Sequence, residues 1–291
     1  MPDLQAELKA AWRVRQARFP PQITFAYPLD TALVSLTGQR CSLQCAHCGG
    51  HYLRHMQPAW DAHVGAATSV LISGGCDLEG RVPVTGYLEQ IRAIRPDRRL
   101  NWHVGFIDEQ TAQTIAPYVD VISFDIVGDV ETIRAVYGLD KTPADYAATY
   151  AMLRRYVHVV PHITIGLHCG AIGHERRAME LLADAGLDAL VFIVFIPTPG
   201  TRYADCPPPE IEEVALLLAE ARQRFPTIPI HLGCMRPQRD YRAQLDPLAV
   251  RAGVNVLVSP TREGRETAQA LGLQAIQTRE CCVFVDRACR S

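Results

Sequence analysis

The sequence predicts an α/β protein in which eight strand–helix units form a (β/α)8 barrel. Between residues 32 and 271, short runs rich in Val, Ile and Phe alternate with longer segments whose apolar residues recur at helical spacing. The short runs are apolar along their length, as expected of parallel strands that are buried on both faces. The number of units favours this barrel over a doubly wound open sheet, which is the alternative.

Each expected strand ends near Gly, Pro, Asp or Cys, residues that commonly follow a strand. The expected strands are Ala32–Thr37, Ser69–Ser73, Leu100–Val104, Val121–Ile126, Val157–Ile165, Ala189–Ile196, Ile228–Leu232 and Asn255–Ser259. Segments with one apolar face lie between them and predict helices. The expected helices are Val84–Ile94, Glu109–Ala116, Ala144–Tyr156, His174–Ala185, Glu210–Phe225, Tyr241–Ala252 and Glu263–Leu271.

The alternation is not interrupted by a Gly/Ser-rich or Pro-rich linker, which argues against two domains. The Pro-Pro-Pro run at 207–209 directly precedes a helix, where proline is favoured. We therefore expect one barrel domain over residues 1–272, in which residues 1–30 form a preceding helix and a strap. Residues 273–291 are expected to form a C-terminal tail that carries cysteines.

Composition restricts the partners and the compartment. The formal net charge of −2 gives no electrostatic reason to expect a nucleic-acid partner. No apolar run approaches the roughly 20 residues that a membrane-spanning helix needs, so no membrane association is expected. The N-terminus is polar and does not resemble a signal peptide. Ten cysteines in such a chain favour metal binding in a reducing compartment over disulfides, and we expect a cytoplasmic protein.

Three cysteines follow the first expected strand in a C-x3-C-x2-C array: Cys41, Cys45 and Cys48. Thiolates are the ligands of iron–sulfur clusters, and three of them bind three irons of a [4Fe–4S] cube. The fourth iron then has no protein ligand and is open to a small molecule. Structural zinc is the alternative, but it usually takes two cysteine pairs, and this segment has one triplet with no second pair nearby.

The array resembles the signature of the radical S-adenosylmethionine (radical SAM) enzymes. In that family the open iron chelates the amino and carboxylate groups of S-adenosylmethionine. Electron transfer then cleaves the sulfonium and produces a 5′-deoxyadenosyl radical, which abstracts hydrogen from an unactivated C–H bond. The resemblance covers roughly residues 30–272. It implies a [4Fe–4S] cluster and S-adenosylmethionine as cofactors, with an electron donor of the ferredoxin or flavodoxin type.

Two further strand ends are similar to family motifs. Ser73-Gly74-Gly75-Cys76 resembles the glycine-glycine-glutamate motif, in which the backbone bonds the methionyl amino group, although Cys76 replaces the glutamate. Asp125 ends the fourth expected strand and fits the family's contact to the ribose hydroxyls; it could equally be an ordinary helix N-cap.

Three other positions correspond to the family's adenine-binding groups. Gly166 ends Ile163-Thr164-Ile165-Gly166, which is similar to the G-x-I-x-G pattern but lacks its first glycine. His47 precedes the last cysteine, where an aromatic residue usually packs against adenine. Residues 197–201, Pro-Thr-Pro-Gly-Thr, match the P-x-P-G-T sequence of biotin synthase-like members, and Pro197 borders the adenosyl site there.

Full barrels characterise four groups of this family: the biotin synthases, the lipoyl synthases, the methylornithine synthases, and the thiazole and hydrogenase-maturation enzymes. The expected eight strands and the sequence at 197–201 therefore narrow the resemblance to these groups. Within them, the subunits of two-component lipoyl synthases are most similar. The chain lacks the N-terminal C-x4-C-x5-C of single-chain lipoyl synthases.

Seven cysteines lie outside the triplet. A second, auxiliary cluster is expected from some of Cys281, Cys282, Cys289, Cys234 and Cys76, because exposed thiols in a tail are prone to oxidation unless something binds them. A frayed terminus with reactive thiols, or buried apolar thiols, is the alternative. Cys206 is interpreted as incidental, and Cys169 as either a wall residue or a ligand.

An auxiliary cluster favours sulfur insertion, since sulfur-inserting members of the family consume one. The substrate would be a small molecule or an acyl chain on a carrier protein, and a second radical SAM protein could be a partner. One alternative is a maturase or mutase that inserts no sulfur, and another is a non-catalytic Fe–S electron-transfer protein. Residues expected at the barrel mouth, and hence candidates for catalysis, are His103, His162, His168, Tyr203 and Arg236.

Overall fold

Eleven parallel strands form one curved sheet in the computed structural model, which describes residues 3–285. The strand order is β11-β1-β10-β9-β8-β7-β6-β5-β4-β2-β3. The strands are β1 (Gln22–Ala26), β2 (Thr31–Ser35), β3 (Gln57–Pro58), β4 (Ser69–Ser73), β5 (Arg99–Trp102), β6 (Val121–Asp125), β7 (Val159–Ile165), β8 (Leu190–Val194), β9 (Ile230–Leu232), β10 (Val256–Val258) and β11 (Gln274–Thr278). Because all the pairs are parallel, the carboxyl ends of the strands share one edge of the sheet.

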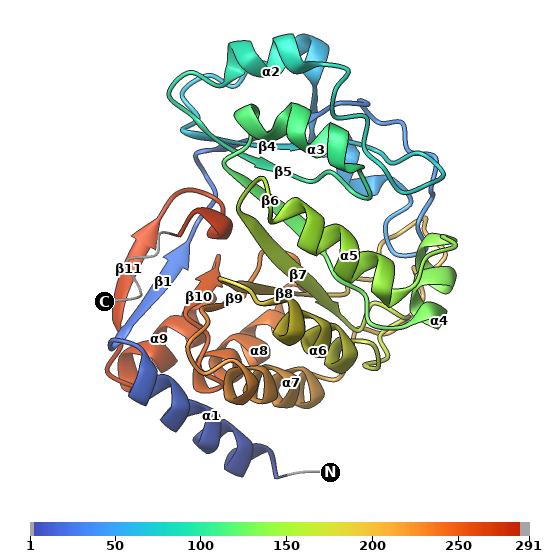
Figure 1. Ribbon diagram of the computed structural model, residues 1–291. Coiled ribbons are helices and arrows are strands. Elements are labelled where there is room, and N and C mark those ends of the chain that lie inside the picture. Colours follow the sequence, from blue (N-terminus) through green and yellow to red (C-terminus); the bar gives the residue numbers. More distant parts are fainter. Residues whose placement is uncertain (1–2, 286–291) are drawn as a thin grey trace.

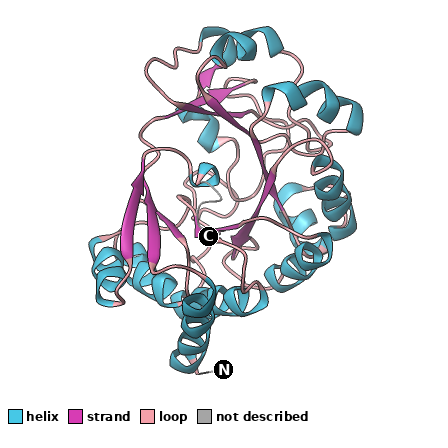
Figure 2. Cartoon of the chain, turned by 60° about the vertical axis from the view of Figure 1, so that its left-hand side comes forward, coloured by secondary structure: helices cyan, strands magenta, loops and turns pink. Residues whose placement is uncertain are grey.

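Helices cover the outer face of this sheet, as Figures 1 and 2 show. They are α1 (Leu4–Arg18), α2 (Leu88–Ile94), α3 (Glu109–Ile115), α4 (Val130–Thr132), α5 (Pro143–Leu153), α6 (Glu175–Ala185), α7 (Ile211–Arg224), α8 (Asp240–Arg251) and α9 (Arg262–Ala270). Outward-facing strand residues such as Val70, Trp102 and Phe192 are fully buried in the core between sheet and helices. This core fixes the positions of the strand ends.

The sheet is a curled partial barrel, and the expected closed (β/α)8 barrel is not formed. Among the described strands, β11 pairs only with β1, and β2 pairs with β3 and β4, so no ladder joins the two ends of the sheet. Loop contacts cross this gap instead: Asp30 N–H donates to the carbonyl of Arg279 at 2.9 Å, and the two side chains form an ion pair at 2.8 Å.

The eight strands expected from the sequence are all present, and β1, β11 and the two-residue β3 are additional. Residues 22–26 were expected in the strap and residues 274–278 in the tail, but β1 lies between β10 and β11 in the sheet. Four of the five residues of β11 are exposed, so it lacks the apolar pattern of the other strands. β1 and β11 lie where the eighth expected strand, β10, would pair with the first, β2, in a closed barrel.

The C-terminal segment, residues 280–285, enters the barrel rather than trailing from it. Its short helix η5 (Cys282–Phe284) packs against inward-facing Val121 and Val256, the first residues of their strands. The Arg99 guanidinium lies 4.7 Å from the centre of the Phe284 ring and donates to the Phe284 carbonyl at 3.1 Å. Arg99 also forms an ion pair with Glu280. The segment therefore fills the end of the barrel at the amino ends of the strands, here called the floor.

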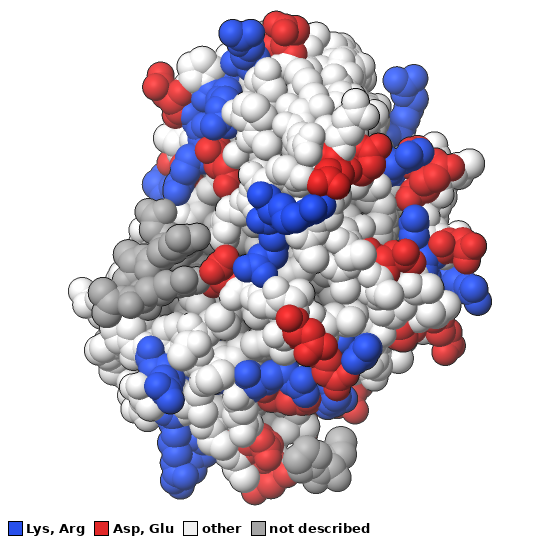
Figure 3. Space-filling model, in the orientation of Figure 1, with Lys and Arg blue, Asp and Glu red and all other residues white. Residues whose placement is uncertain are grey.

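No helix among the described residues is both long and apolar enough to cross a membrane. On the face shown in Figure 3, positive and negative side chains are interspersed, and neither sign forms an extended patch. The distribution of charge on this face thus agrees with the small net charge of the sequence.

Candidate functional site

The cysteine array forms a loop directly after β2, at the carboxyl edge of the sheet. Backbone hydrogen bonds fix this loop to three segments that are distant in the sequence. Ser42 N–H donates to the Cys76 carbonyl at 2.8 Å, and Ala46 N–H donates to the Val136 carbonyl at 2.7 Å. Tyr203 N–H donates to the Ala46 carbonyl at 3.0 Å. The loops after β4, β6 and β8 therefore determine where the thiols lie.

Gly75 makes the closest approach to this loop. A Cβ atom on Gly75 would lie 1.9 Å from the Arg40 carbonyl oxygen and 2.5 Å from Cys41 Cα, so no other residue fits without moving backbone. The Gly75 N–H donates to Thr37 Oγ1 at 2.7 Å. A Cβ on Gly74 would be 3.1 Å from a methyl group of Val82. Gly75 thus lets the loop after β4 lie directly against Cys41, and Gly74 packs against Val82 and Thr37.

The thiols of the array interact with one another. Cys45 and Cys48 share a hydrogen bond that, together with burial, raises the pKa of Cys45. The same bond lowers the pKa of Cys48, and His47 lowers it further. Burial raises the pKa of the neighbouring Cys76 thiol to about 12, with Cys41 contributing in the same direction. At least one thiol of the array is therefore prepared to act as a thiolate ligand.

The described residues contain no group of three or more His, Cys, Asp or Glu side chains that could hold a metal ion. A cluster makes a different demand, because in a [4Fe–4S] cube each cysteine binds its own iron and the sulfurs need not meet at one point. Three thiols on one loop, with a thiolate favoured at Cys48, agree with that arrangement. The donor set therefore fits a cluster better than a mononuclear zinc site.

Asp125 and His47 lie beside the array. Asp125 ends β6 and is accessible to solvent, yet the surrounding protein desolvates its carboxyl group and raises its pKa to about 6. The His47 ring packs edge-on against Tyr137 with its centroid 5.7 Å away, and its buried Nδ1 has no hydrogen-bond partner. The Asp125 carboxyl is therefore open to a bound molecule, and one ring nitrogen of His47 lacks a protein partner.

Residues 197–201 also border the cysteine loop. Thr198 Oγ1 donates to the Ile196 carbonyl at 3.0 Å, so the Tyr52 hydroxyl, 3.3 Å away, is the donor in their shared hydrogen bond. Tyr52 follows the array in the short helix η1 (His51–His55), and both Cys48 and Cys234 contribute to raising its pKa, after burial. Tyr52 is a site residue that the sequence analysis missed, because no spacing rule pointed to it.

Gly166, directly after β7, makes two hydrogen bonds within the chain through its backbone groups. Its N–H donates to Glu175 Oε1 at 2.7 Å, and its carbonyl accepts from Gly170 N–H at 2.8 Å. A Cβ on Gly166 would meet Pro209 at 2.8 Å, and its φ is +72°. Both backbone groups are therefore engaged inside the chain, and the geometry gives this glycine a role in shaping the loop after β7.

The loops after β7 and β8 are joined covalently by a disulfide between Cys169 and Cys206. This corrects two expectations from the sequence: that the cysteines do not form disulfides, and that Cys206 is incidental. The two residues are 37 positions apart and meet because parallel neighbouring strands bring their following loops together. The disulfide fixes the loop that carries Pro197 relative to the loop after β7.

The mouth candidates do not all face the barrel. Arg236 is fully buried, and it forms an ion pair with Asp246 at 2.9 Å while donating to the Gly233 and Val258 carbonyls. This geometry gives it a structural role. Tyr203 stacks on His168 with ring centroids 6.5 Å apart, at the rim. The His103 and His162 rings lie 6.2 Å apart inside the barrel.

Two cysteines of the expected auxiliary set lie at the floor. Cys281 N–H donates to Thr31 Oγ1 at 3.1 Å, and Asn101 Nδ2 donates to Cys281 Sγ at 3.9 Å. Cys282 is 5 % exposed and packs among the inward valines. Cys76 lies at the cysteine array instead, Cys234 is solvent-accessible, and Cys289 lies outside the described residues.

The barrel interior contains accessible space between the floor and the cysteine array. Outward-facing strand residues are almost fully buried, but the inward-facing Leu33, Leu71 and Ile193 are only partly buried. Asp125 and Cys234 are exposed, although nearby protein desolvates both groups and raises their pKa values. In a filled barrel such inward side chains would pack against each other. We call the accessible space between the floor and the cysteine array the hollow.

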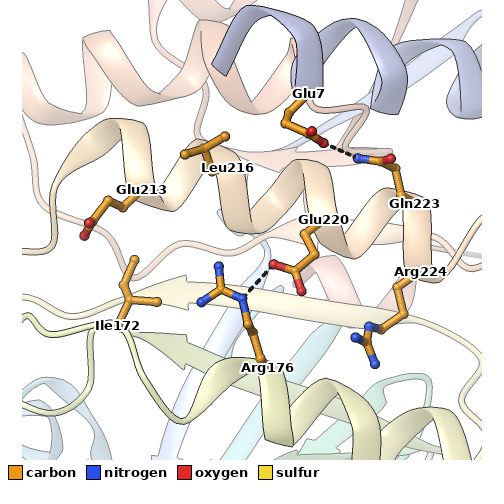
Figure 4. Close-up of a pocket in the computed structure, with 8 residues that line it drawn as sticks. All are labelled: Glu7, Ile172, Arg176, Glu213, Leu216, Glu220, Gln223 and Arg224. Atoms are coloured by element: carbon orange, nitrogen blue, oxygen red, sulfur yellow. Dashed lines mark hydrogen bonds and ion pairs between the residues drawn. The ribbon is translucent and has the colours of Figure 1, made fainter. Parts of the chain in front are cut away.

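A separate surface pocket of about 720 Å³ lies on the helical side of the molecule (Figure 4). Arg176 and Glu220 form an ion pair across it at 2.8 Å, and Gln223 donates to Glu7 at 2.9 Å. These paired groups come from α1, α6 and α7, away from the carboxyl edge of the sheet. The chemistry-bearing residues gather at the cysteine array instead.

No model of a known protein family matches the sequence, and no curated protein matches it. Solved structures do match. Methylornithine synthase (PylB) superposes with a TM-score of 0.66 at 13 % identity, over 94 % of this chain and 89 % of that chain. HydG, a maturase of the [FeFe]-hydrogenase, gives 0.67 at 13 % identity, over 96 % and 69 %. The HMG-CoA lyase from Brucella melitensis gives 0.53 at 12 % identity, over 84 % and 92 %.

At these identities the comparisons show the fold: a curled, parallel α/β barrel. Methylornithine synthases and hydrogenase-maturation enzymes are two of the four groups to which the expected strands and the sequence at 197–201 narrowed the resemblance. The lyase shares the fold as well, so the barrel alone does not select the chemistry. The reaction must therefore be argued from the site.

Proposed function

We propose that this protein is a radical SAM enzyme that acts on a small molecule in the hollow of its barrel. The observation that carries the proposal is the contact between Gly75 and Cys41, which places a side-chain-free loop against three thiols at the carboxyl edge of a parallel barrel. Cys41, Cys45 and Cys48 would hold the cluster. When bound, the cluster and S-adenosylmethionine supply one-electron chemistry that abstracts hydrogen from an unactivated C–H bond.

The chain's own residues would bind and orient the cofactor. Gly74 and Gly75 leave the backbone uncovered beside the cysteine loop. Asp125 offers carboxylate oxygens to ribose hydroxyls, and the unpaired Nδ1 of His47 offers a polar contact near the adenosyl group. Pro197 and Thr198 border the loop through Tyr52. The partly apolar hollow below would exclude bulk water from a reactive substrate.

Of the finer assignments, we favour a rearrangement or fragmentation without sulfur insertion. Sulfur insertion in this family needs an auxiliary cluster, and two of the thiols expected to hold one have other contacts. The Cys282 side chain packs in the valine floor, and the Cys281 sulfur accepts from Asn101 Nδ2 while the Cys281 backbone N–H donates to Thr31. A structural role for the C-terminal segment explains both positions.

Anaerobic reconstitution tests the proposal. We expect about four irons per chain and dithionite-driven formation of 5′-deoxyadenosine from S-adenosylmethionine. Cys45→Ala should abolish both, whereas Cys282→Ala should leave both near the wild-type values. Cleavage that survived Cys45→Ala would overturn the assignment. About eight irons per chain, falling toward four in Cys281→Ala/Cys282→Ala, would instead favour sulfur insertion.

A further inference from the structure

Three histidines face the interior of the barrel. His103 follows β5, His162 lies on β7 and His231 on β9. The register places His162 beside Asp125 on one side and Val191 on the other, and Val191 lies beside His231. Ile230 and Leu232 face the outer core, so His231 between them faces inward. His231 is a polar residue within an apolar strand. This pattern could have identified it as a candidate from the sequence, but it was not used above.

All three imidazoles are neutral at physiological pH. Burial lowers the pKa of His162 to about 3 and the pKa values of His103 and His231 to about 4. Each ring therefore carries one hydrogen-bond donor and one acceptor.

The neighbouring groups determine which nitrogens remain available. His162 Nδ1 lies 3.1 Å from the Val160 carbonyl, which can only accept, so its Nε2 is an acceptor. His231 is 3 % exposed, and its buried Nδ1 has no partner. A buried polar atom without a partner is unfavourable, which indicates that a ligand completes the site.

The described strands supply no free cation to the hollow. The Arg236 guanidinium is bonded to Asp246, and Arg99 is engaged by Glu280 and the Phe284 carbonyl. The charged group that does face the hollow is the Asp125 carboxyl. A carboxylate or phosphate buried there would have no positive partner on these strands, whereas an ammonium or hydroxyl group would find acceptors.

We propose that the hollow binds a substrate whose buried end is a hydrogen-bond donor, either an ammonium or a hydroxyl group, and that His162 and His231 recognise it. The inference rests on the proposed function in calling this ligand a substrate. The binding preference itself follows from the side chains. Acidic substrates are disfavoured by the same arrangement, because the described strands place no free positive group against their charge.

Three five-carbon probes of similar length test the preference: 1,5-diaminopentane, 1,5-pentanediol and glutarate. Each is titrated calorimetrically at neutral pH into the reconstituted protein with S-adenosylmethionine. We expect the diamine to bind at least about tenfold more tightly than glutarate, the difference that one charge-assisted hydrogen bond supplies. Glutarate binding as tightly as the diamine, or no binding of the diamine, would overturn the inference.

Histidine variants test whether His162 and His231 cause the preference for the diamine. His162→Leu and His231→Leu should each weaken diamine binding about tenfold, and His231→Asn, which restores an acceptor, should recover part of the loss. His63→Leu is the matched control, because the His63 side chain is 85 % exposed. Unchanged diamine binding in both leucine variants would also overturn the inference. If a leucine variant does not fold, the probe series on the wild-type protein still decides.

Formation of 5′-deoxyadenosine is measured on the same preparations. Cleavage combined with a preference for glutarate contradicts the inference and leaves the proposed function standing. A preference for the diamine without cleavage contradicts the proposed function and leaves the binding site standing.

Discussion

Gly75 and Cys41 are in such close contact that a single methyl group between them would overlap the backbone. The contact joins the loop after β4 to the loop after β2, and a hydrogen bond from Ser42 N–H to the Cys76 carbonyl at 2.8 Å reinforces it. The position of the thiols therefore depends on Gly75, which lies more than thirty residues after Cys41 in the sequence.

Gly75→Ala should displace the cysteine loop. Overpacking of this kind typically costs about 1–3 kcal/mol, and here the atoms that must move are backbone. We expect reconstituted iron to fall well below that of the wild-type protein, measured by iron analysis and visible absorption. Gly86→Ala is the control, since its nearest added contact is an ordinary 3.6 Å. Equal iron content in both variants would contradict the role assigned to Gly75.

Asp246→Ala should be strongly destabilising, because it leaves the buried Arg236 guanidinium without its carboxylate. Loss of one partner of a buried ion pair costs about 3–5 kcal/mol. The exposed pair Arg262–Glu266, at 2.6 Å, is the control, and Glu266→Ala should cost less than about 1 kcal/mol. Denaturant unfolding of both variants measures the difference. Similar free energies of unfolding would show that Arg236 is not the structural residue described above.

The disulfide should be detectable and should stabilise the protein. Alkylation without prior reduction should leave Cys169 and Cys206 unmodified, and mass spectrometry should find them linked. Cys169→Ser/Cys206→Ser should lower the free energy of unfolding by about 2–4 kcal/mol. We also expect weaker binding of S-adenosylmethionine, since the disulfide fixes the loop that carries Pro197. Both thiols alkylated in unreduced native protein would contradict the pairing.

Asp125→Asn should change how stability depends on pH. Burial raises the pKa of Asp125 from 3.8 to about 6 in the folded chain. The folded state therefore holds this proton more tightly than the unfolded state, and the wild-type protein loses stability as pH rises from about 4 through 6. The variant lacks this loss, so it should unfold at a higher temperature than the wild-type protein at pH 8 and nearly the same temperature at pH 4. Thermal unfolding without S-adenosylmethionine measures this; an advantage confined to acidic pH would contradict the assignment.

Much of the fold could be predicted because most of its strands are apolar along their length. The apolar runs at Ser69–Ser73 and Val121–Asp125 identify strands by composition, and the intervening helices by their periodicity. β11 could not be recognised in this way, because its residues are mostly exposed and its pairing with β1 spans almost the whole chain. The sequence therefore predicted a closed barrel, whereas the sheet is open between β11 and β2.

The sequence by itself determined the cysteine array, its position after a strand and the glycine pair one unit later, because these depend on local spacing. Only the tertiary structure decided which groups meet. It bonded Arg236 to Asp246, joined Cys169 to Cys206, and placed Cys281 and Cys282 at the floor. The physical reason is that the residue type and the local spacing determine which kinds of bond a side chain can make. Packing between segments far apart in the chain determines which partner it finds.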